Sequence, residues 1–144
     1  MSITTRTGAL GREESFARDA RVEYRLVRNS VVRDVRAGRR EKVDVCDAHP
    51  ELMRAAKNVG KPTGESCPIC DSNETVEVTY VFGAGLPAGG TCPATAAELA
   101  RLRGREDPVT CYAVEVCPGC GWHHLARRYP AGRNPTRPRR RRQP

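Results

Sequence analysis

The sequence has few aromatic residues, very little lysine and no long apolar run. Aromatic residues make up 5% and hydrophobic residues 38% of the 144 positions, which limits the core that the chain can build. No apolar stretch approaches membrane-spanning length, and the first eleven residues lack the apolar centre of a secretory signal. We therefore expect a small cytoplasmic protein that needs a source of stability besides hydrophobic burial.

Two short cysteine pairs predict a metal site. Each has the form Cys-Pro-x-Cys, and the four cysteines are Cys67, Cys70, Cys117 and Cys120. In a reducing compartment, seven cysteines favour metal ligands and free thiols over disulfides. Two such pairs separated by a strand-like segment are typical of a zinc ribbon, in which four thiolates hold one structural Zn²⁺, with iron as the alternative ion. A redox function is the weaker alternative, because a redox pair normally begins a helix.

The net charge of +8 comes mostly from the C-terminal end. Six arginines and no acidic residues lie in the last twelve positions, whereas residues 1–132 hold 19 basic and 17 acidic side chains. The tail at Arg137–Arg142 is either a polyphosphate contact or only a solubilising extension. A second basic surface is predicted on a helix flank, where the residues at helical spacing are Arg18, Arg21, Arg25 and Arg28. This flank is either simply solvated or a contact for an acidic partner or RNA.

The first half of the chain predicts two helices. The first runs from about Glu13 to Ala37 and ends at Gly38. Its apolar stripe consists of Ala20, Tyr24, Val27, Val31 and Val35. The second begins near Asp47 and Pro50 and ends at Gly60. We expect these two helices to form a pair.

The second half predicts a three-stranded antiparallel sheet. Apolar and polar residues alternate over Glu74–Phe82 and Val109–Val116, and Trp122–Tyr129 returns from the second cysteine pair. Thr95 and Glu98 form a capping box that begins a short inserted helix, Ala96–Arg103.

The predicted fold class is therefore α+β. An N-terminal helical pair is followed by a three-stranded zinc ribbon with a short helical insertion and a disordered basic tail. The expected boundaries are a disordered N-terminus over 1–12, the helical pair over 13–60, the ribbon module over 61–130 and the disordered Arg/Pro-rich tail over 131–144.

The remaining histidines, cysteines and tryptophan have less specific expectations. His123 and His124 are neighbours on a strand and point to opposite faces of the sheet, so they cannot both bind the same metal ion. Either can hydrogen-bond a ligand sulfur or a carbonyl. Trp122 is expected to cover the metal end, with stacking on a nucleic-acid base as the alternative. Three cysteines are expected to be free thiols: Cys46, Cys92 and Cys111.

His49 and Glu51 offer an enzymatic alternative, because zinc deaminases combine a histidine and two cysteines as ligands with a proton-transferring glutamate. That signature requires a proline directly before the cysteine pair, where this sequence has Val116. It also gives no role to Cys67 and Cys70. We therefore expect no enzymatic activity.

Several motifs in order resemble a domain-of-unknown-function family of small actinobacterial zinc-ribbon proteins. They are Val45-Cys46-Asp47-Ala48, Leu52 with Arg54-Ala55-Ala56-Lys57, Cys67-Pro68-Ile69-Cys70, Val81-Phe82-Gly83, Val114-Glu115-Val116-Cys117, and Cys120 with Trp122, His124 and Leu125. The resemblance spans residues 20–130 and implies that the four paired cysteines are zinc ligands. It implies no activity.

We expect a non-enzymatic adaptor or regulatory protein that docks on a cytoplasmic macromolecular assembly. The transcription or translation machinery is the natural class of partner, by analogy of fold. The alternative is direct binding of nucleic acid through the helix flank and the tail. We expect neither a membrane nor a small-molecule substrate as partner.

Overall fold

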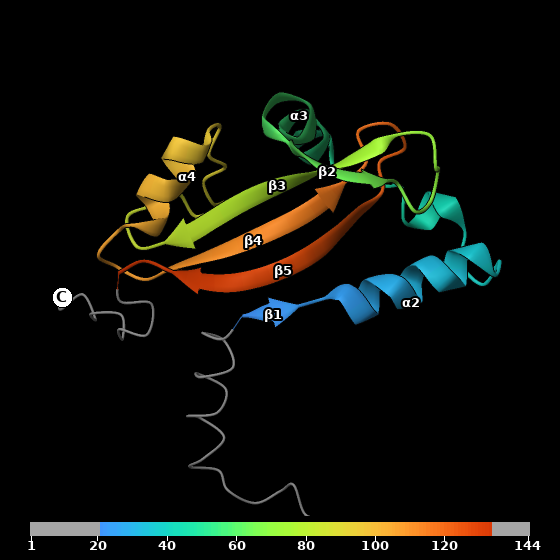
Figure 1. The fold of residues 1–144 in the computed structure, drawn as a ribbon, viewed down its shortest axis with the longest axis horizontal. Helices are drawn as coiled ribbons and strands as arrows, with labels where there is room; N and C mark the ends of the chain where they lie inside the picture. The colour runs from blue at the N-terminus through green and yellow to red at the C-terminus, as the bar shows by residue number, and fades with distance from the viewer. Residues whose placement is uncertain (1–20, 134–144) are drawn as a thin grey trace, which may run out of the picture.

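A five-stranded antiparallel sheet is the centre of the protein (Figure 1). The computed structural model describes residues 21–133. The strands are β1 (Val22–Glu23), β2 (Lys61–Ser66), β3 (Glu74–Gly83), β4 (Val109–Val116) and β5 (His123–Ala131), in the spatial order β1-β5-β4-β3-β2. The helices are α2 (Arg25–Arg36), α3 (Pro50–Val59) and α4 (Ala96–Arg103), and a 3₁₀ turn spans Lys42–Asp44.

The two long central strands have the alternation that the sequence predicts. Val78 and Val116 point to one face of the sheet, where they pack against Ala56 of α3. Val81 and Cys111 point to the other face and form a cluster with Leu99 and Leu102 of α4. We call these the α3 face and the α4 face. Because α3 and α4 cover different faces, the central strands β3 and β4 have buried side chains on both sides.

Local capping sets the bounds of the two shorter helices. The imidazole Nδ1 of His49 accepts a hydrogen bond from the Glu51 N–H, and α3 begins at Pro50, where the missing proline N–H does no harm. In α4, the Thr95 hydroxyl accepts from the Glu98 N–H while the Glu98 carboxylate accepts from the Ala94 N–H. The α4 bounds are those predicted, whereas the cap of α3 is His49 and not Asp47.

The predicted fold class is wrong in its arrangement. The sheet has five strands instead of three, and α2 and α3 pack against different parts of it instead of forming a pair (Figure 1). Lys61–Ser66, which reads as a polar linker, is the edge strand β2. Every residue of β2 is exposed, so it carries no apolar alternation, and Pro62 is tolerated because the strand lies at an edge.

The start of α2 also differs from the prediction. Val22 and Glu23 pair with β5, and the Tyr24 N–H donates to the Ala126 carbonyl, so α2 begins only at Arg25. The rest of the predicted helix before residue 21 lies outside the described residues. So do the predicted disorder of residues 1–12 and almost all of the tail over 131–144.

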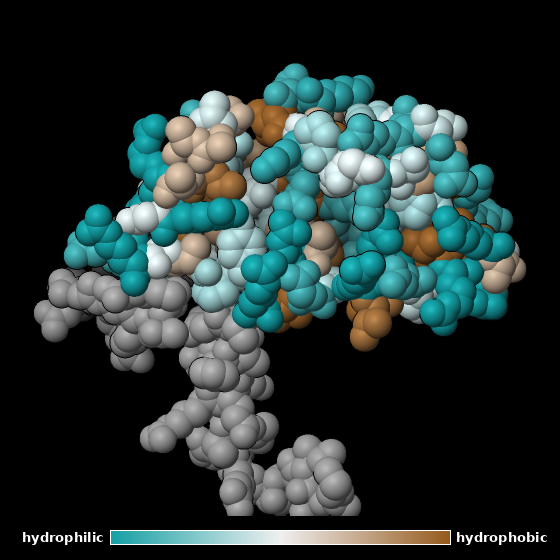
Figure 2. All heavy atoms as spheres, in the orientation of Figure 1, coloured by the Kyte–Doolittle hydropathy of each residue, from teal (hydrophilic) through white to brown (hydrophobic). Residues whose placement is uncertain are grey.

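Charged and apolar side chains are interspersed on the surface (Figure 2). Within residues 21–133, no helix is both long enough and apolar enough to cross a membrane. Three large apolar side chains are nevertheless exposed: Leu26, Val27 and Val43.

Gly60 marks a close contact between α3 and the sheet, which gives a test of this packing. A Cβ at this position would lie 2.3 Å from the Ala56 carbonyl oxygen and 2.6 Å from Cγ2 of Val76. We expect Gly60→Ala to lower the free energy of unfolding by about 1 to 3 kcal/mol, measured by urea denaturation. Gly89→Ala is the matched control, because a Cβ at that position would have nothing within 4 Å. Equal stability of the two variants would contradict this packing.

Candidate metal centre

The two cysteine pairs lie in turns at the same end of the sheet. Cys67 follows β2, and Cys117 follows β4. The pairing of Val76 with Val116 places the start of β3 beside the end of β4, so the turn before β3 and the turn after β4 come together. Pairing of the two central strands therefore brings four thiols together from residues about fifty positions apart.

Both turns have the same backbone arrangement. The Asp71 N–H donates to the Cys67 carbonyl and the Gly121 N–H to the Cys117 carbonyl, each at 3.0 Å. The residue after each pair is left-handed, with φ of 57° at Asp71 and 88° at Gly121. This repeated conformation turns the backbone N–H groups toward the sulfurs.

Backbone N–H groups surround the sulfurs. Cys67 Sγ accepts from the N–H groups of Ile69 and Cys70 at 3.4 and 3.5 Å. In the second turn, Cys117 Sγ accepts from the Cys120 N–H and Cys120 Sγ from the Trp122 N–H, both at 3.4 Å. Such donors stabilise negative charge on sulfur, which is what thiolate ligands of a metal require.

The sulfur geometry fits a tetrahedral ion. The Sγ atoms of Cys67, Cys70, Cys117 and Cys120 all lie within 4.8 Å of one another. Two contacts across the turns, Cys67–Cys120 and Cys70–Cys117, measure 3.7 Å. A Zn–S bond of about 2.3 Å in a regular tetrahedron separates its sulfurs by about 3.8 Å. These four predicted residues are therefore a group that could hold a metal ion.

Burial and hydrogen bonding shift the pKa values of Cys67, Cys70 and Cys120 in different directions. Burial raises the pKa of Cys67 to about 11, against the hydrogen bonds from its own turn. Burial raises the pKa of Cys120 as well. For Cys70 burial acts in the same direction, but hydrogen bonds from the Ser72 backbone, Asn73 and the neighbouring cysteines outweigh it and lower the pKa to about 6. A bound metal cation would favour the thiolate form of each ligand.

Asn73 and Gly119 form a contact that sequence reasoning missed. The Asn73 amide donates to Cys70 Sγ at 3.7 Å. A Cβ at Gly119 would lie 2.1 Å from that amide nitrogen, so a larger residue here would require the Asn73 side chain to move away from Cys70. The glycine inside the second Cys-Pro-Gly-Cys motif is the sequence feature that could have indicated a close contact at this position.

A fifth sulfur lies beside the cluster. Cys46 Sγ is 3.5 Å from Cys120 Sγ, although Cys46 is not one of the four sulfurs that lie within 4.8 Å of one another. The sequence predicted only a free thiol at this position. Its location depends on a loop that packs on the second turn, where the Ala48 N–H donates to the Gly121 carbonyl at 3.1 Å.

Trp122 covers the cluster, as predicted, and its partners fix α2 in place. Its side chain is 1% exposed and packs with Cys67, Cys117 and Val32 of α2. The indole N–H donates to the Glu115 carboxylate, which also accepts from the Arg28 Nε at 3.0 and 3.1 Å. Arg28 therefore joins α2 to the sheet through a partly buried carboxylate.

The two histidines have separate roles, as the alternation of the strand predicts. His124 stacks on Trp122 with ring centroids 5.9 Å apart, and burial lowers its pKa, which favours the neutral imidazole. His123 Nε2 lies 3.0 Å from a carboxylate oxygen of Asp47. Neither histidine belongs to the group of residues that could hold a metal ion, which consists of the four paired cysteines.

The other candidate residues lie elsewhere. His49 caps α3 and contacts the backbone of Glu51. Cys92 packs in the cluster under α3, whereas Cys111 is fully buried under α4. Along the predicted basic flank, Arg21 pairs with Glu23, Arg28 with Glu115, and Arg25 is exposed. Arg18 and Arg137–Arg142 lie outside the described residues.

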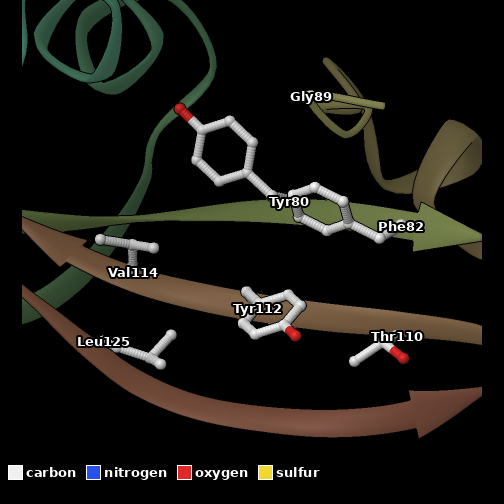
Figure 3. A pocket seen from close by; sticks show the side chains of 7 residues that line it. All are labelled: Tyr80, Phe82, Gly89, Thr110, Tyr112, Val114 and Leu125. Carbon is white, nitrogen blue, oxygen red and sulfur yellow. The ribbon is translucent and has the colours of Figure 1, made fainter. Parts of the chain in front are cut away.

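A shallow aromatic pocket lies away from the cysteines (Figure 3). It encloses about 520 Å³ on the α3 face, beyond the part that α3 covers, and Tyr80, Phe82, Tyr112 and Leu125 line it. The rings of Phe82 and Tyr112 meet edge to face at a centroid distance of 5.3 Å. Its lining is mostly apolar and holds none of the cysteines.

The fold and the cluster define a small protein built on an antiparallel sheet, with four converging cysteines that could bind a metal. The chain belongs to the family of unknown function DUF5318, whose sequence profile matches residues 16–144. Uncharacterized protein Rv0049 of Mycobacterium tuberculosis and Uncharacterized protein Mb0050 of Mycobacterium bovis are each 42% identical to it over 118 residues. Each alignment covers 81% of this chain and 86% of the relative. No solved structure matches the chain. These matches confirm the predicted actinobacterial family.

The Glu115 carboxylate provides a test of how α2 is held. Replacing it in Glu115→Ala leaves the buried Trp122 N–H and the Arg28 guanidinium without their acceptor. We expect the free energy of unfolding to fall by about 2 to 3 kcal/mol. The single tryptophan makes this measurable by fluorescence during urea unfolding. In the exposed pair with Arg21, Glu23→Ala should cost less than about 1 kcal/mol, and an equal loss in both variants would refute the buried role.

Proposed function

We propose that this chain is a non-enzymatic zinc protein of the cytoplasm in which one Zn²⁺, held by Cys67, Cys70, Cys117 and Cys120, fixes a surface that docks on a macromolecular assembly. The convergence of the four sulfurs at tetrahedral spacing carries the proposal. Zinc favours four-thiolate sites of this kind and stabilises the fold that supplies them.

The ligand count supports a structural role for the metal. Four thiolates complete a tetrahedral coordination shell, so such an ion has no open position at which to activate water or polarise a substrate. His49, the ligand of the enzymatic alternative, caps α3 by accepting a hydrogen bond from the backbone N–H of Glu51. The proposed function therefore lies in surfaces around the cluster.

The solvent face of α2 is the surface that best suits a partner. It consists of Arg25, Leu26, Asn29 and Arg33, which are all exposed and follow one another at spacings of one, three and four residues. Leu26 is 84% exposed and its neighbour Val27 is 55% exposed, so two adjacent apolar side chains of this helix face solvent. An apolar centre flanked by two arginines suits a protein surface with an apolar pocket and acidic rim.

Nucleic-acid binding is less well supported for this helix. Of the three described arginines on the predicted basic flank, Arg21 and Arg28 contact carboxylates of the same chain. A guanidinium already paired with a buried carboxylate contributes little to phosphate binding. A protein partner is accordingly the stronger proposal.

Metal analysis tests the zinc site. We expect one zinc per chain in the purified protein and in Cys92→Ser, and almost none in Cys67→Ser, because the fully buried Cys67 is a ligand whereas Cys92 packs under α3. Inductively coupled plasma mass spectrometry gives both the identity and the amount of the metal. His49→Ala should retain its zinc. Full occupancy in Cys67→Ser, or loss in His49→Ala, would contradict the four-thiolate site.

Affinity purification from the native cell tests the docking surface. We expect a protein that copurifies with the wild-type chain to be lost with Leu26→Asp, because a charge at the centre of the α2 solvent face opposes apolar contact. Val43→Asp is the control, since Val43 is also exposed, at 68%, but lies in the 3₁₀ turn. Equal recovery from both variants would reject this surface. Filter binding at two salt concentrations tests the alternative, for which a steep salt dependence is the signature of phosphate contacts.

A further inference from the structure

The fifth thiol lies as close to the cluster as the ligands lie to one another. Cys46 Sγ donates a hydrogen bond to Cys120 Sγ at 3.5 Å, compared with 3.7 Å between Cys67 and Cys120. A disulfide requires about 2.05 Å between its sulfurs, so the pair must approach by about 1.5 Å. This is within reach of side-chain rotation and a small adjustment of the turn.

The backbone holds Cys46 in this position. Its N–H donates to the Lys42 carbonyl at 2.8 Å, which closes the 3₁₀ turn before it. On the other side, a Cβ at Gly121 would lie 3.0 Å from the Cys46 carbonyl oxygen. Glycine is required there by the φ of 88° as well as by this contact. The Cys46 thiol is therefore fixed beside the second cysteine pair.

Solvent access distinguishes the sulfurs. Cys67 and Cys117 are 0% exposed, whereas Cys46 and Cys120 are only partly buried. Cys70 is also partly buried, but its nearest sulfur across the turns, at 3.7 Å, belongs to Cys117, another member of the four. Among the described residues, Cys120 is therefore the one partly exposed cysteine of the four that has a neighbouring thiol from outside the four, namely Cys46.

We propose that Cys46 and Cys120 form a disulfide when hydrogen peroxide oxidises the cluster, and that this modification removes Cys120 as a metal ligand. The Cys120 thiolate attacks the peroxide, an S–O bond forms, the O–O bond breaks, and the departing hydroxide takes a proton to become water. Cys46 then attacks the Cys120 sulfur. The S–S bond forms, the S–O bond breaks, and the second oxygen leaves as water with the Cys46 proton. The two sulfurs lose two electrons, which the peroxide gains.

This inference rests on the proposed zinc site and adds its regulation. Loss of Cys120 leaves three sulfurs of the closed tetrahedral set, so the affinity for zinc falls and the ion is released. The new bond also ties the loop that carries Cys46 to the second turn.

Peroxide treatment of the zinc-loaded, full-length chain tests the inference. Zinc release is followed with a colorimetric chelator, and disulfides are mapped by mass spectrometry after free thiols are alkylated. We expect a Cys46–Cys120 disulfide to appear in step with zinc release. In Cys46→Ser, which should bind one zinc as the wild type does, we expect release several-fold slower. Cys92→Ser should behave as the wild type.

Three results would overturn the inference: zinc release from Cys46→Ser at the wild-type rate, a peptide map dominated by disulfides within either Cys-x-x-Cys pair, or loss of zinc from untreated Cys46→Ser. Cys46→Ala, compared by circular dichroism, checks that the fold is retained. If the purified chain holds no zinc, the proposed function fails, and the peptide map alone then decides whether Cys46 and Cys120 pair first.

Discussion

The convergence of four cysteine sulfurs at one end of the sheet is the constraint on which the surrounding structure depends. It needs the pairing of β3 with β4, because only that register sets the turn before β3 beside the turn after β4. In return, the cluster supplies a core where the chain has few aromatic residues. Val32 of α2, Val45 of the following loop and Trp122 all pack around Cys67 and Cys117. Parts from three regions of the chain therefore share one centre.

A single carboxylate connects this centre to α2. Glu115 accepts from both the Arg28 guanidinium and the indole N–H of Trp122, so its partly buried charge has a partner on two sides. The contact fixes which side of α2 faces the sheet. Because Arg28 and Val32 point inward, Leu26 must point outward, and its exposure follows from the same ion pair that holds the helix. The proposed docking face is thus a consequence of the packing around the cysteines.

Sequence patterns predicted the features that depend on local chemistry. Alternation located β3 and β4, the Thr95 capping box located α4, and cysteine spacing identified the four sulfurs that the structure brings together. The predicted arrangement of strands and helices was wrong where the sequence carries no local pattern for a strand. β2 is exposed at every residue, β1 has only two residues within an apparent helical stripe, and neither can be recognised without its partner strand. The position of Cys46 depends on its contact with Gly121, seventy-five positions away, which spacing along the chain does not encode.

The segment from α2 to Cys46 joins the two proposed properties of the protein. Its start presents Leu26 to solvent, its middle packs on the cluster through Val32, and its end carries the thiol beside Cys120. A small core tolerates the loss of one such anchor poorly, because few other apolar contacts hold the helix. A metal ion held by all four thiolates would have no open position for a substrate, but it would stabilise the turns on which this segment packs. A change in the coordination of such an ion would therefore also affect how α2 is held, and with it the α2 solvent face that we propose for docking.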